Sequence, residues 1–419
     1  MKDHKKTTHR GNSNISRRDF IAGVGATAMS FAVMKPSLVR GTEANSKIKL
    51  GIIGCGMRGK WITDLFAKHG GYEIVAAADY FQDRVDELGE KFGVDKAHRY
   101  TTLSGYKRLL EQDLDAVAIE SPPYFHPEQA AAAVDAGVNV IVAKPSAVDV
   151  PGCNLIAESG KKATAKKLVF YVDFQTRANE FYREAVKRAQ YGNIGRFVCG
   201  EASFKCGDVW KYGWNPVEPL LKENPTNPET RLRAWGMDKV LSGSIVVEQT
   251  IHAIDVATWI LDSDPVSAYG SGGRKHYEYG DIWDYFAVIY QFPNNVLVNL
   301  MAKQCDGGHF GNNGCLMYGL TGAIDTHYGG KVSIQGSNPY KGGSTGNLYP
   351  EGTSANIATF YNNITKARFD NPTVAPSVRS NLASILARDA AYKGSVVTWD
   401  EMLKASEKLE SDVIKGLKA

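Results

Sequence analysis

The distribution of apolar and polar positions divides the chain into two parts of different character. From about residue 47 to 175, short apolar runs alternate with segments of helical spacing, and the links between them are short. Continuous apolar runs of this length are typical of strands buried in a parallel sheet. The strands predicted in this way are Ile48–Ile53, Tyr72–Ala78, Asp115–Glu120, Asn139–Ala143 and Lys167–Val172. Helices are predicted at Gln82–Phe92, from Tyr100 to near Glu111, and at Pro127–Ala136. This alternation predicts a doubly wound α/β domain with right-handed crossovers.

Beyond about residue 175, strand-like runs dominate and predict a second, α+β domain on an antiparallel sheet. After a helix at Asn179–Gln190, the expected strands are Phe197–Lys205, Val266–Gly270, Trp283–Phe292, Val296–Ala302 and Cys315–Gly319. The glycine-rich stretches Gly307–Gly314 and Gly329–Gly346 are predicted to be loops. The C-terminal region returns to helix at Ser377–Tyr392, and a capping box at Thr398–Glu401 opens a last helix. We expect a leader at residues 1–44, the first domain at 45–172, the second at 173–375 and C-terminal helices at 376–419.

The first predicted strand runs into a complete G-x-G-x-x-G motif at Gly54, Gly56 and Gly59. A strand, a tight turn and a helix N-terminus in this order present backbone N–H groups to the phosphates of a dinucleotide. The second strand ends at Asp79, twenty positions past Gly59, where a carboxylate would meet the adenosine ribose hydroxyls. An acid there favours NAD over NADP, because it would repel a 2′-phosphate. Glycine triplets are common, and Asp79 alone could be a loop cap. The prediction of dinucleotide binding therefore depends on the glycine motif and Asp79 together.

The basic charge of the chain is concentrated in its first 40 residues. The net charge is +4, but residues 1–40 carry eight lysines and arginines against two aspartates, so the remainder carries −2. The basic balance is therefore no sign of nucleic-acid binding. Ser16-Arg17-Arg18-Asp19-Phe20-Ile21 followed by a short apolar stretch has the form of a twin-arginine export signal. We expect periplasmic localisation, reached through the twin-arginine export machinery with the cofactor already loaded. The six cysteines show neither C-x-x-C pairs nor zinc spacing, so no disulfide framework is expected.

A second informative stretch, from Gly243 to Leu261, carries Glu248, His252 and Asp255 at helical spacing. On one helix these side chains would share a face, and a carboxylate beside an imidazole raises its basicity, as a general base requires. A structural, hydrogen-bonded histidine is the plainer interpretation. Metal binding is the third, but no second histidine cluster supports it, so we expect no metal site.

From about residue 47 to the C-terminus, the chain resembles the Gfo/Idh/MocA family, named after glucose–fructose oxidoreductase, inositol dehydrogenase and a rhizopine-catabolism protein. The resemblance is carried by Gly54-x-Gly56-x-x-Gly59, Asp79, the proline turn ending in His126, Lys144-Pro145, Gln175-x-Arg177, and Glu248, His252 and Asp255. It implies a Rossmann domain followed by an open antiparallel sheet that often forms homo-oligomers, here a dimer or tetramer. It also implies that Lys144 lies beside the nicotinamide and hydrogen-bonds the reacting oxygen, and that His252 is the general acid/base.

Two positions depart from the family pattern. The family usually has Glu before the Lys-Pro pair, where this chain has Ala143, and Asp where this chain has Glu248. The first change removes a carboxylate that would hold Lys144 and keep it charged. The second keeps the charge and lengthens the side chain by one methylene.

The motifs and the resemblance together define the candidate site. The candidate catalytic residues are Lys144, His252 and Glu248. The candidate cofactor-binding residues are Gly54, Gly56, Met57, Arg58, Gly59, Asp79, Ser121, Pro122, His126, Lys144 and Gln175. The candidate substrate-binding residues are Arg177, Trp235, Asp255 and Arg231, because aromatic faces stack on sugars and charged side chains bind hydroxyls.

Three functions remain open from the sequence. The first is an exported NAD-dependent oxidoreductase that moves a hydride between NAD and a secondary hydroxyl of a sugar, glycoside or cyclitol. The second is an NAD-dependent glycosidase or lyase that oxidises its sugar transiently and recycles a bound cofactor. The third is a non-enzymatic periplasmic sugar-binding protein, in which Lys144 and His252 would be idle.

Overall fold

The computed structural model describes residues 47–419 of the chain, except residues 214, 307 and 309–312. The predicted leader at 1–44 and most of the predicted loop Gly307–Gly314 therefore lie outside the described residues. Residues 46–419 form one compact unit, and the domain boundaries within it stay predictions. Among the described helices, none combines the length and apolar character needed to cross a bilayer.

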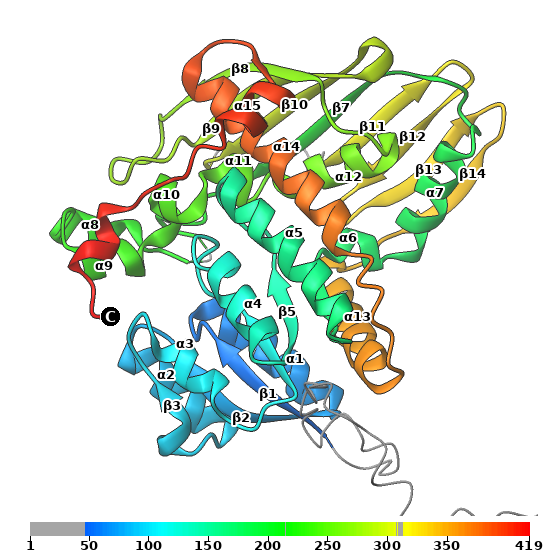
Figure 1. Cartoon of the computed structure of the whole chain (residues 1–419). Coiled ribbons are helices and arrows are strands. Elements are labelled where there is room, and N and C mark those ends of the chain that lie inside the picture. Colours follow the sequence, from blue (N-terminus) through cyan, green and yellow to red (C-terminus); the bar gives the residue numbers. More distant parts are fainter. Residues whose placement is uncertain (1–46, 214, 307, 309–312) are drawn as a thin grey trace, which may run out of the picture. The chain divides into compact units, whose positions relative to one another are not determined.

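The N-terminal half is a parallel six-stranded sheet with strand order β3-β2-β1-β4-β5-β6, which confirms the predicted α/β domain (Figure 1). Its strands are β1 (Ile48–Ile53), β2 (Tyr72–Ala78), β3 (Arg99–Tyr100), β4 (Ala116–Ile119), β5 (Asn139–Ala143) and β6 (Phe170–Asp173). Its helices are α1 (Met57–His69), α2 (Gln82–Phe92), α3 (Gly105–Leu110), α4 (His126–Asp135) and α5 (Val150–Ala165). The order reverses direction beside β1, and ligands of such sheets bind at this switch point.

Both faces of this sheet are buried, as the continuous apolar runs predicted. Helices α1 and α2, with the later helix α13 (Leu348–Thr365), pack on one face through a core that includes Ile62, Leu88 and Phe360. Helices α3, α4 and α5 pack on the other face. The strand β4, AVAI, is buried at every position because neither face meets water.

The C-terminal half is built on a nine-stranded sheet of order β14-β13-β12-β11-β7-β10-β9-β8-β15. Its strands are β7 (Phe197–Cys206), β8 (Ser267–Gly273), β9 (Tyr285–Phe292), β10 (Val296–Gln304), β11 (Gly314–Gly319), β12 (Gly322–His327), β13 (Lys331–Gly336), β14 (Tyr340–Ser344) and β15 (Val397–Thr398). Neighbouring strands are antiparallel apart from the parallel pair β7 and β10. This confirms the predicted α+β part with a mainly antiparallel sheet.

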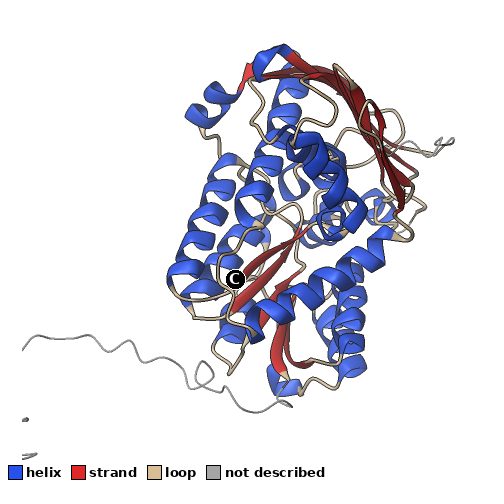
Figure 2. Cartoon of the chain, turned by 90° about the vertical axis from the view of Figure 1, so that its right-hand side faces the viewer, coloured by secondary structure: helices blue, strands red, loops and turns tan. Residues whose placement is uncertain are grey.

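Helices gather on one face of the nine-stranded sheet and leave the other face open (Figure 2). The covering helices include α7 (Glu180–Gln190), α12 (Ile251–Leu261) and α14 (Val374–Lys393). Along β10 the residues alternate between buried and exposed, the pattern of a strand with one face in the core. Short helices complete the fold: α6 (Gln175–Ala178), α8 (Glu218–Glu223), α9 (Pro228–Arg233), α10 (Lys239–Ser242), α11 (Ile245–Glu248) and α15 (Trp399–Ala405).

The loop predicted at Gly329–Gly346 was wrong, because this stretch contains β13 and β14. Glycine occurs there where the hairpin needs it: Gly342 has φ of +56°, and a Cβ at that position would lie 1.7 Å from the carbonyl oxygen of Val332. The helix predicted from Tyr100 to Glu111 is also shorter than expected, since Tyr100 ends β3 and α3 begins at Gly105.

Candidate active site

The glycine motif forms the expected tight turn between β1 and α1. Gly54 has φ of +94°, and a Cβ there would lie 2.4 Å from the backbone nitrogen of Ser121. A Cβ at Gly59 would lie 1.9 Å from the carbonyl oxygen of Gly54, so any larger residue would separate helix from strand. A Cβ at Gly56 would meet only the side chain of Arg84, at 3.6 Å. The turn is thus closed towards the protein and open where a phosphate would approach the helix N-terminus.

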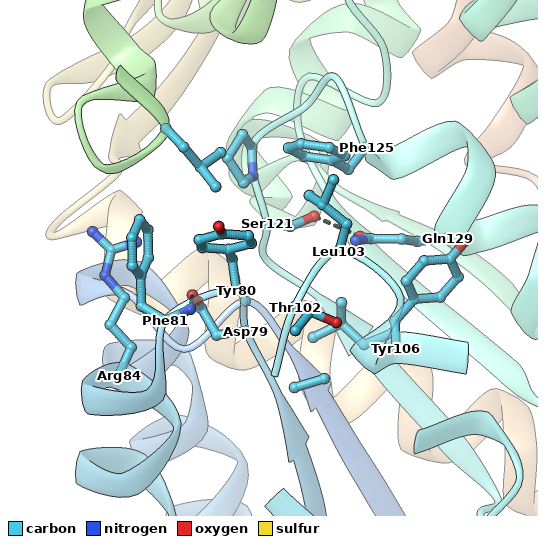
Figure 3. Close-up of a pocket in the computed structure, with 15 residues that line it drawn as sticks. Asp79, Tyr80, Phe81, Arg84, Thr102, Leu103, Tyr106, Ser121, Phe125 and Gln129 are labelled. Carbon is cyan, nitrogen blue, oxygen red and sulfur yellow. Dashed lines mark hydrogen bonds between the residues drawn. The ribbon is translucent and has the colours of Figure 1, made fainter. Parts of the chain in front are cut away.

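Asp79 lies beside this turn at the end of β2. One carboxylate oxygen accepts a hydrogen bond from the Cys55 backbone N–H at 2.8 Å, and the other accepts from the Phe81 N–H at 3.0 Å. A carboxylate has about four acceptor sites, so capacity remains for ribose hydroxyls. Figure 3 shows Asp79 facing a hollow with Tyr80, Arg84 and Thr102, which is the expected place for the adenosine half of a dinucleotide.

A larger cavity of about 420 Å³ continues from the glycine turn to the second half of the molecule. Most of the candidate residues line it: Gly54, Gly56, Met57, Arg58, Gly59, Asp79, Ser121, Pro122, His126, Lys144, Trp235, Glu248 and His252. Aromatic side chains supply much of the remaining wall, namely Phe204, Trp210, Tyr328 and Tyr349. One cavity therefore joins the predicted phosphate turn to the predicted catalytic residues.

Lys144 is buried at the end of β5 and is held by Glu248. Its Nζ donates to the Glu248 backbone carbonyl at 2.5 Å and lies 3.4 Å from the Glu248 carboxylate. Burial lowers the pKa of Lys144, and the charge of Glu248 opposes this shift. The carboxylate partner that Ala143 cannot provide thus comes from Glu248, across 104 positions of sequence.

His252 does not have the carboxylate neighbour that the helical spacing predicted. The stretch breaks between α11, which ends at Glu248, and α12, which begins at Ile251, so Glu248 and His252 do not share one continuous helix. The His252 ring instead lies between Phe204 and Tyr328, with centroid distances of 5.4 and 5.2 Å. Its Nδ1 is buried and has no hydrogen-bond partner among the described residues.

The surroundings of His252 keep its imidazole neutral. Burial lowers the pKa of His252 well below its ordinary value, and the positive charges of Lys144 and Arg58 lower it further. The prediction that a neighbouring acid raises the basicity of His252 was therefore wrong. What the structure provides is a neutral imidazole in the cavity wall, and its buried Nδ1 has no hydrogen-bond partner among the described residues.

Four candidate residues do not line the cavity. Arg177 forms a paired contact with the buried Asp255, at 2.8–3.1 Å, and the Ser380 hydroxyl also donates to Asp255. Gln175 is fully buried and donates to Asp173 and Thr353. These side chains tie β6 and α6 to α12, α13 and α14.

The fourth, Arg231, pairs with Asp238 at 2.6 Å and with Asp412 at 3.0 Å. It lines a separate small hollow with Asp281. Because its guanidinium is paired with two carboxylates of the protein, Arg231 links α9 to Asp238 and Asp412.

Several residues that line the cavity were not predicted from the sequence, notably Glu120. Glu120 directly follows β4, so the rule that ligands meet the carboxyl ends of strands would have included it. The aromatic residues Phe204, Tyr328 and Tyr349 come from three separate segments, and nothing in the local sequence brings them together.

Two family profiles match this chain. The one described as "Oxidoreductase family, NAD-binding Rossmann fold" matches residues 48–173, and the "GFO/IDH/MocA C-terminal domain" matches residues 182–325. The chain belongs to the GFO/IDH/MocA family. Its N-terminal half is accordingly an NAD-binding Rossmann domain.

Relatives within the GFO/IDH/MocA family include dehydrogenases and glycosyl hydrolases. Inositol 2-dehydrogenase 3 of Saccharopolyspora erythraea is 31% identical over 222 residues, which cover 53% of this chain and 56% of that protein. A glycosyl hydrolase family 109 protein of Porphyromonas gingivalis is 28% identical over 178 residues, covering 40% of this chain and 37% of that protein. The match thus spans about half of the first relative and less of the second.

Solved structures of the family share the fold. Scyllo-inositol dehydrogenase from Lactobacillus casei with bound NAD(H) and scyllo-inositol has a TM-score of 0.65 at 19% identity, covering 85% of this chain and all of that one. Myo-inositol 2-dehydrogenase from Lactobacillus plantarum has a TM-score of 0.64 at 21% identity, covering 84% of this chain and 99% of that one. At these identities the likeness shows the fold alone.

Proposed function

We propose that this protein is an NAD-dependent oxidoreductase that transfers a hydride between NAD and a secondary hydroxyl of a cyclitol or sugar. The observation that carries the proposal is the single cavity that joins the glycine turn to Lys144, Glu248 and His252. The inositol dehydrogenases among the relatives support this substrate class. The open turn at Gly56 fits the phosphates of a dinucleotide, and the aromatic and polar side chains that line the cavity fit a polyhydroxylated substrate.

His252, Lys144 and Glu248 have different roles at the hydroxyl that reacts. Bound NAD supplies the nicotinamide that takes up the hydride. His252, whose neutral imidazole lines the cavity, accepts the proton of the substrate hydroxyl. Lys144 donates a hydrogen bond to the same oxygen and stabilises the negative charge that develops on it. Glu248 holds Lys144 in place through its carbonyl and its carboxylate.

The cavity wall suits a ring of carbons and hydroxyls. Trp210 and Trp235 meet edge to face with ring centroids 5.6 Å apart, and both line the cavity with Tyr328. Aromatic faces pack against C–H surfaces, while Trp N–H groups donate to hydroxyls. The Nε1 of Trp210 is buried and has no hydrogen-bond partner among the described residues.

A second candidate is an NAD-dependent glycosidase or lyase, favoured by the glycosyl hydrolase family 109 relatives. Lys144 and His252 would assist the transient oxidation of the sugar by bound NAD, the ketone so formed would acidify the neighbouring C–H, and loss of that proton would allow a group to be eliminated before the hydride returns. This route needs no exchange of NADH, which would suit an exported protein.

This proposal also includes export through the twin-arginine route, a periplasmic location and a homo-oligomer. The homo-oligomer is supported by the exposed side chains of Tyr269, Ile289 and Met301 on the open sheet.

One assay separates these candidates. The purified protein is incubated with NAD⁺ and with myo-inositol, scyllo-inositol, glucose or an aryl glucoside, while absorbance at 340 nm and aglycone release are followed. Net NADH from a polyol supports the oxidoreductase, and aglycone release without net NADH supports the glycosidase. Binding of NAD⁺ without any turnover across the panel would contradict the proposed oxidoreductase on these substrates.

The pairing of Lys144 with Glu248 predicts a double-mutant rescue. Glu248→Asp withdraws the carboxylate from Lys144 by about one methylene, so kcat/KM should fall about tenfold, the size of one weakened charged hydrogen bond. Adding Ala143→Glu should restore most of this loss, because position 143 precedes Lys144 and lines the same cavity. The control is Ala143→Gln in the Glu248→Asp background, which adds similar volume without charge. An equal rescue by glutamine, or no loss in Glu248→Asp, would show that the carboxylate is not what Lys144 needs.

A further inference from the structure

Two buried acids flank Ala143 at the carboxyl edge of the parallel sheet. In the strand register, Ile119 of β4 pairs with Val142 of β5, and Ala143 pairs with Asp173 of β6. The residue after Ile119 is Glu120, so Glu120, Ala143 and Asp173 lie in one row across three strands. The side chains of Glu120 and Asp173 are fully buried.

A single cation, Arg58 of the glycine motif, pairs with both acids. Its Nε lies 2.8 Å from Glu120, its Nη2 lies 2.7 Å from Asp173, and its Nη1 donates to the Tyr349 hydroxyl at 2.6 Å. Arg58 was predicted to bind the cofactor; it lines the main cavity, and these side chains hold its guanidinium.

The two acids differ in how their oxygens are satisfied. Asp173 accepts hydrogen bonds from Asn356 at 2.6 Å and from Gln175 at 3.1 Å. Glu120 is ion-paired with Arg58, and its oxygens accept no hydrogen bond from any other residue that the structure describes. Glu120 also lines the main cavity, whereas Asp173 does not. A buried carboxylate with unused acceptors at a cavity wall is unusual unless it serves a ligand.

The charges around this part of the cavity leave a net negative charge. Arg58 neutralises one of its two acids, and Lys144 is offset by Glu248. The two nearby imidazoles contribute nothing, because burial lowers the pKa of His126 to about 4 and that of His252 well below its ordinary value. The Tyr349 hydroxyl stays protonated, since burial raises its pKa.

NAD⁺ and NADH differ in charge only at the nicotinamide ring, which is positive when oxidised and neutral when reduced. We propose that the cluster of Glu120, Arg58 and Asp173 makes this site bind NAD⁺ more tightly than NADH. In a buried site, an unbalanced carboxylate attracts the cationic ring and is little screened by water. The inference rests on the nicotinamide occupying this cavity, as the proposed function requires. Any repulsion of the pyrophosphate by the cluster is common to both forms and cancels in their ratio.

The preference for NAD⁺ should depend on pH near neutrality. Burial raises the pKa of Glu120 to about 7, although Arg58 opposes the shift. Below pH 7 Glu120 is protonated, the cluster carries no net charge, and the preference is weak. Above pH 7 Glu120 is ionised and the preference is strong. The groups facing Glu120 are Arg58 on α1, Lys144 after β5 and Asp173 at the end of β6, with Tyr349 beyond Arg58 on α13.

The test compares dissociation constants for NAD⁺ by calorimetry and for NADH by fluorescence, using the full chain without substrate. In Glu120→Gln, the ratio of the NADH constant to the NAD⁺ constant should fall about tenfold, mostly through weaker NAD⁺ binding. Glu73→Gln, which removes an exposed carboxylate from β2, should keep the wild-type ratio. A wild-type ratio in Glu120→Gln, or equal weakening of both forms, would overturn the proposal.

The unaltered protein provides a second test that does not depend on the variant folding. The ratio of its dissociation constant for NADH to that for NAD⁺ should rise about tenfold from pH 5.5 to 8.5, with a midpoint near pH 7. A ratio that stays flat across this range would overturn the proposal. If neither form binds at any pH, the proposed function itself fails, which is a different outcome from two forms that bind with an unchanged ratio.

Discussion

Replacing Lys144 by methionine should slow hydride transfer about 1,000-fold and leave NAD⁺ binding within about tenfold of wild type, because the only charge effect is that of the unpaired Glu248. The reason is that Lys144 lines the same cavity as the glycine turn and His252 and is held there by Glu248. Methionine keeps the length of the side chain and removes the donor and the charge. The substrate oxygen then develops its negative charge without a partner, while the turn that holds the pyrophosphate is untouched.

Stopped-flow absorbance at 340 nm with the best polyol of the panel measures this rate in a single turnover, and calorimetry measures NAD⁺ binding. The control is Lys68→Met, which removes an exposed lysine from the end of α1. It should match wild type in both measurements. A Lys144→Met rate within tenfold of wild type would show that Lys144 does not stabilise the reacting oxygen.

Replacing Asp79 by serine should change the cofactor preference towards NADP by about 100-fold in the ratio of kcat/KM values. Asp79 would repel a 2′-phosphate, and a like-charge contact of this kind costs several kcal/mol. Losing about 2–3 kcal/mol of repulsion corresponds to this factor. The guanidinium of Arg84 lies beside the turn, 4.9 Å over the Phe81 ring, and would then attract the phosphate. Serine keeps a short acceptor for the backbone N–H of Cys55.

The matched variant is Asp79→Ser with Arg84→Ala, in which the repulsion and the attraction are both removed. It should lose most of the gain in NADP use while keeping weak activity with NAD. Steady-state rates with NAD⁺ and NADP⁺ at matched substrate concentrations give the ratios. If Asp79→Ser leaves the preference for NAD unchanged, the acid does not face the adenosine ribose.

The N-terminal half was predictable because each of its physical signals is local. A strand buried on both faces must be apolar throughout, as β4 is, and a tight turn beneath a phosphate needs glycine at Gly54 and Gly59. The strand ends then mark the binding edge without any knowledge of long-range contacts. Asp79 and Lys144 were found in this way, and both line the cavity.

The second half was harder because its sheet and its ion pairs depend on distant partners. Glycines in the stretch 329–346 resembled a loop, yet pairing of β13 with β14 satisfies their backbone groups. Glu248, His252 and Asp255 were expected to share one face of a helix, but the break before α12 separates Glu248 from the other two. Asp255 instead pairs with Arg177, 78 positions away, and Glu248 pairs with Lys144. Local periodicity in the sequence does not show which distant residues form ion pairs.

The central claim is that the cavity lined by the glycine turn, Lys144 and His252 holds NAD. The most direct measurement is to denature the purified full chain, identify any released dinucleotide by mass and ultraviolet absorbance, and titrate the emptied native protein with NAD⁺ by calorimetry. We expect either released NAD(H) or saturable binding of one NAD⁺ per chain that Gly59→Val, with its clash at the Gly54 carbonyl, abolishes. A folded protein that releases no dinucleotide and binds none would contradict the account.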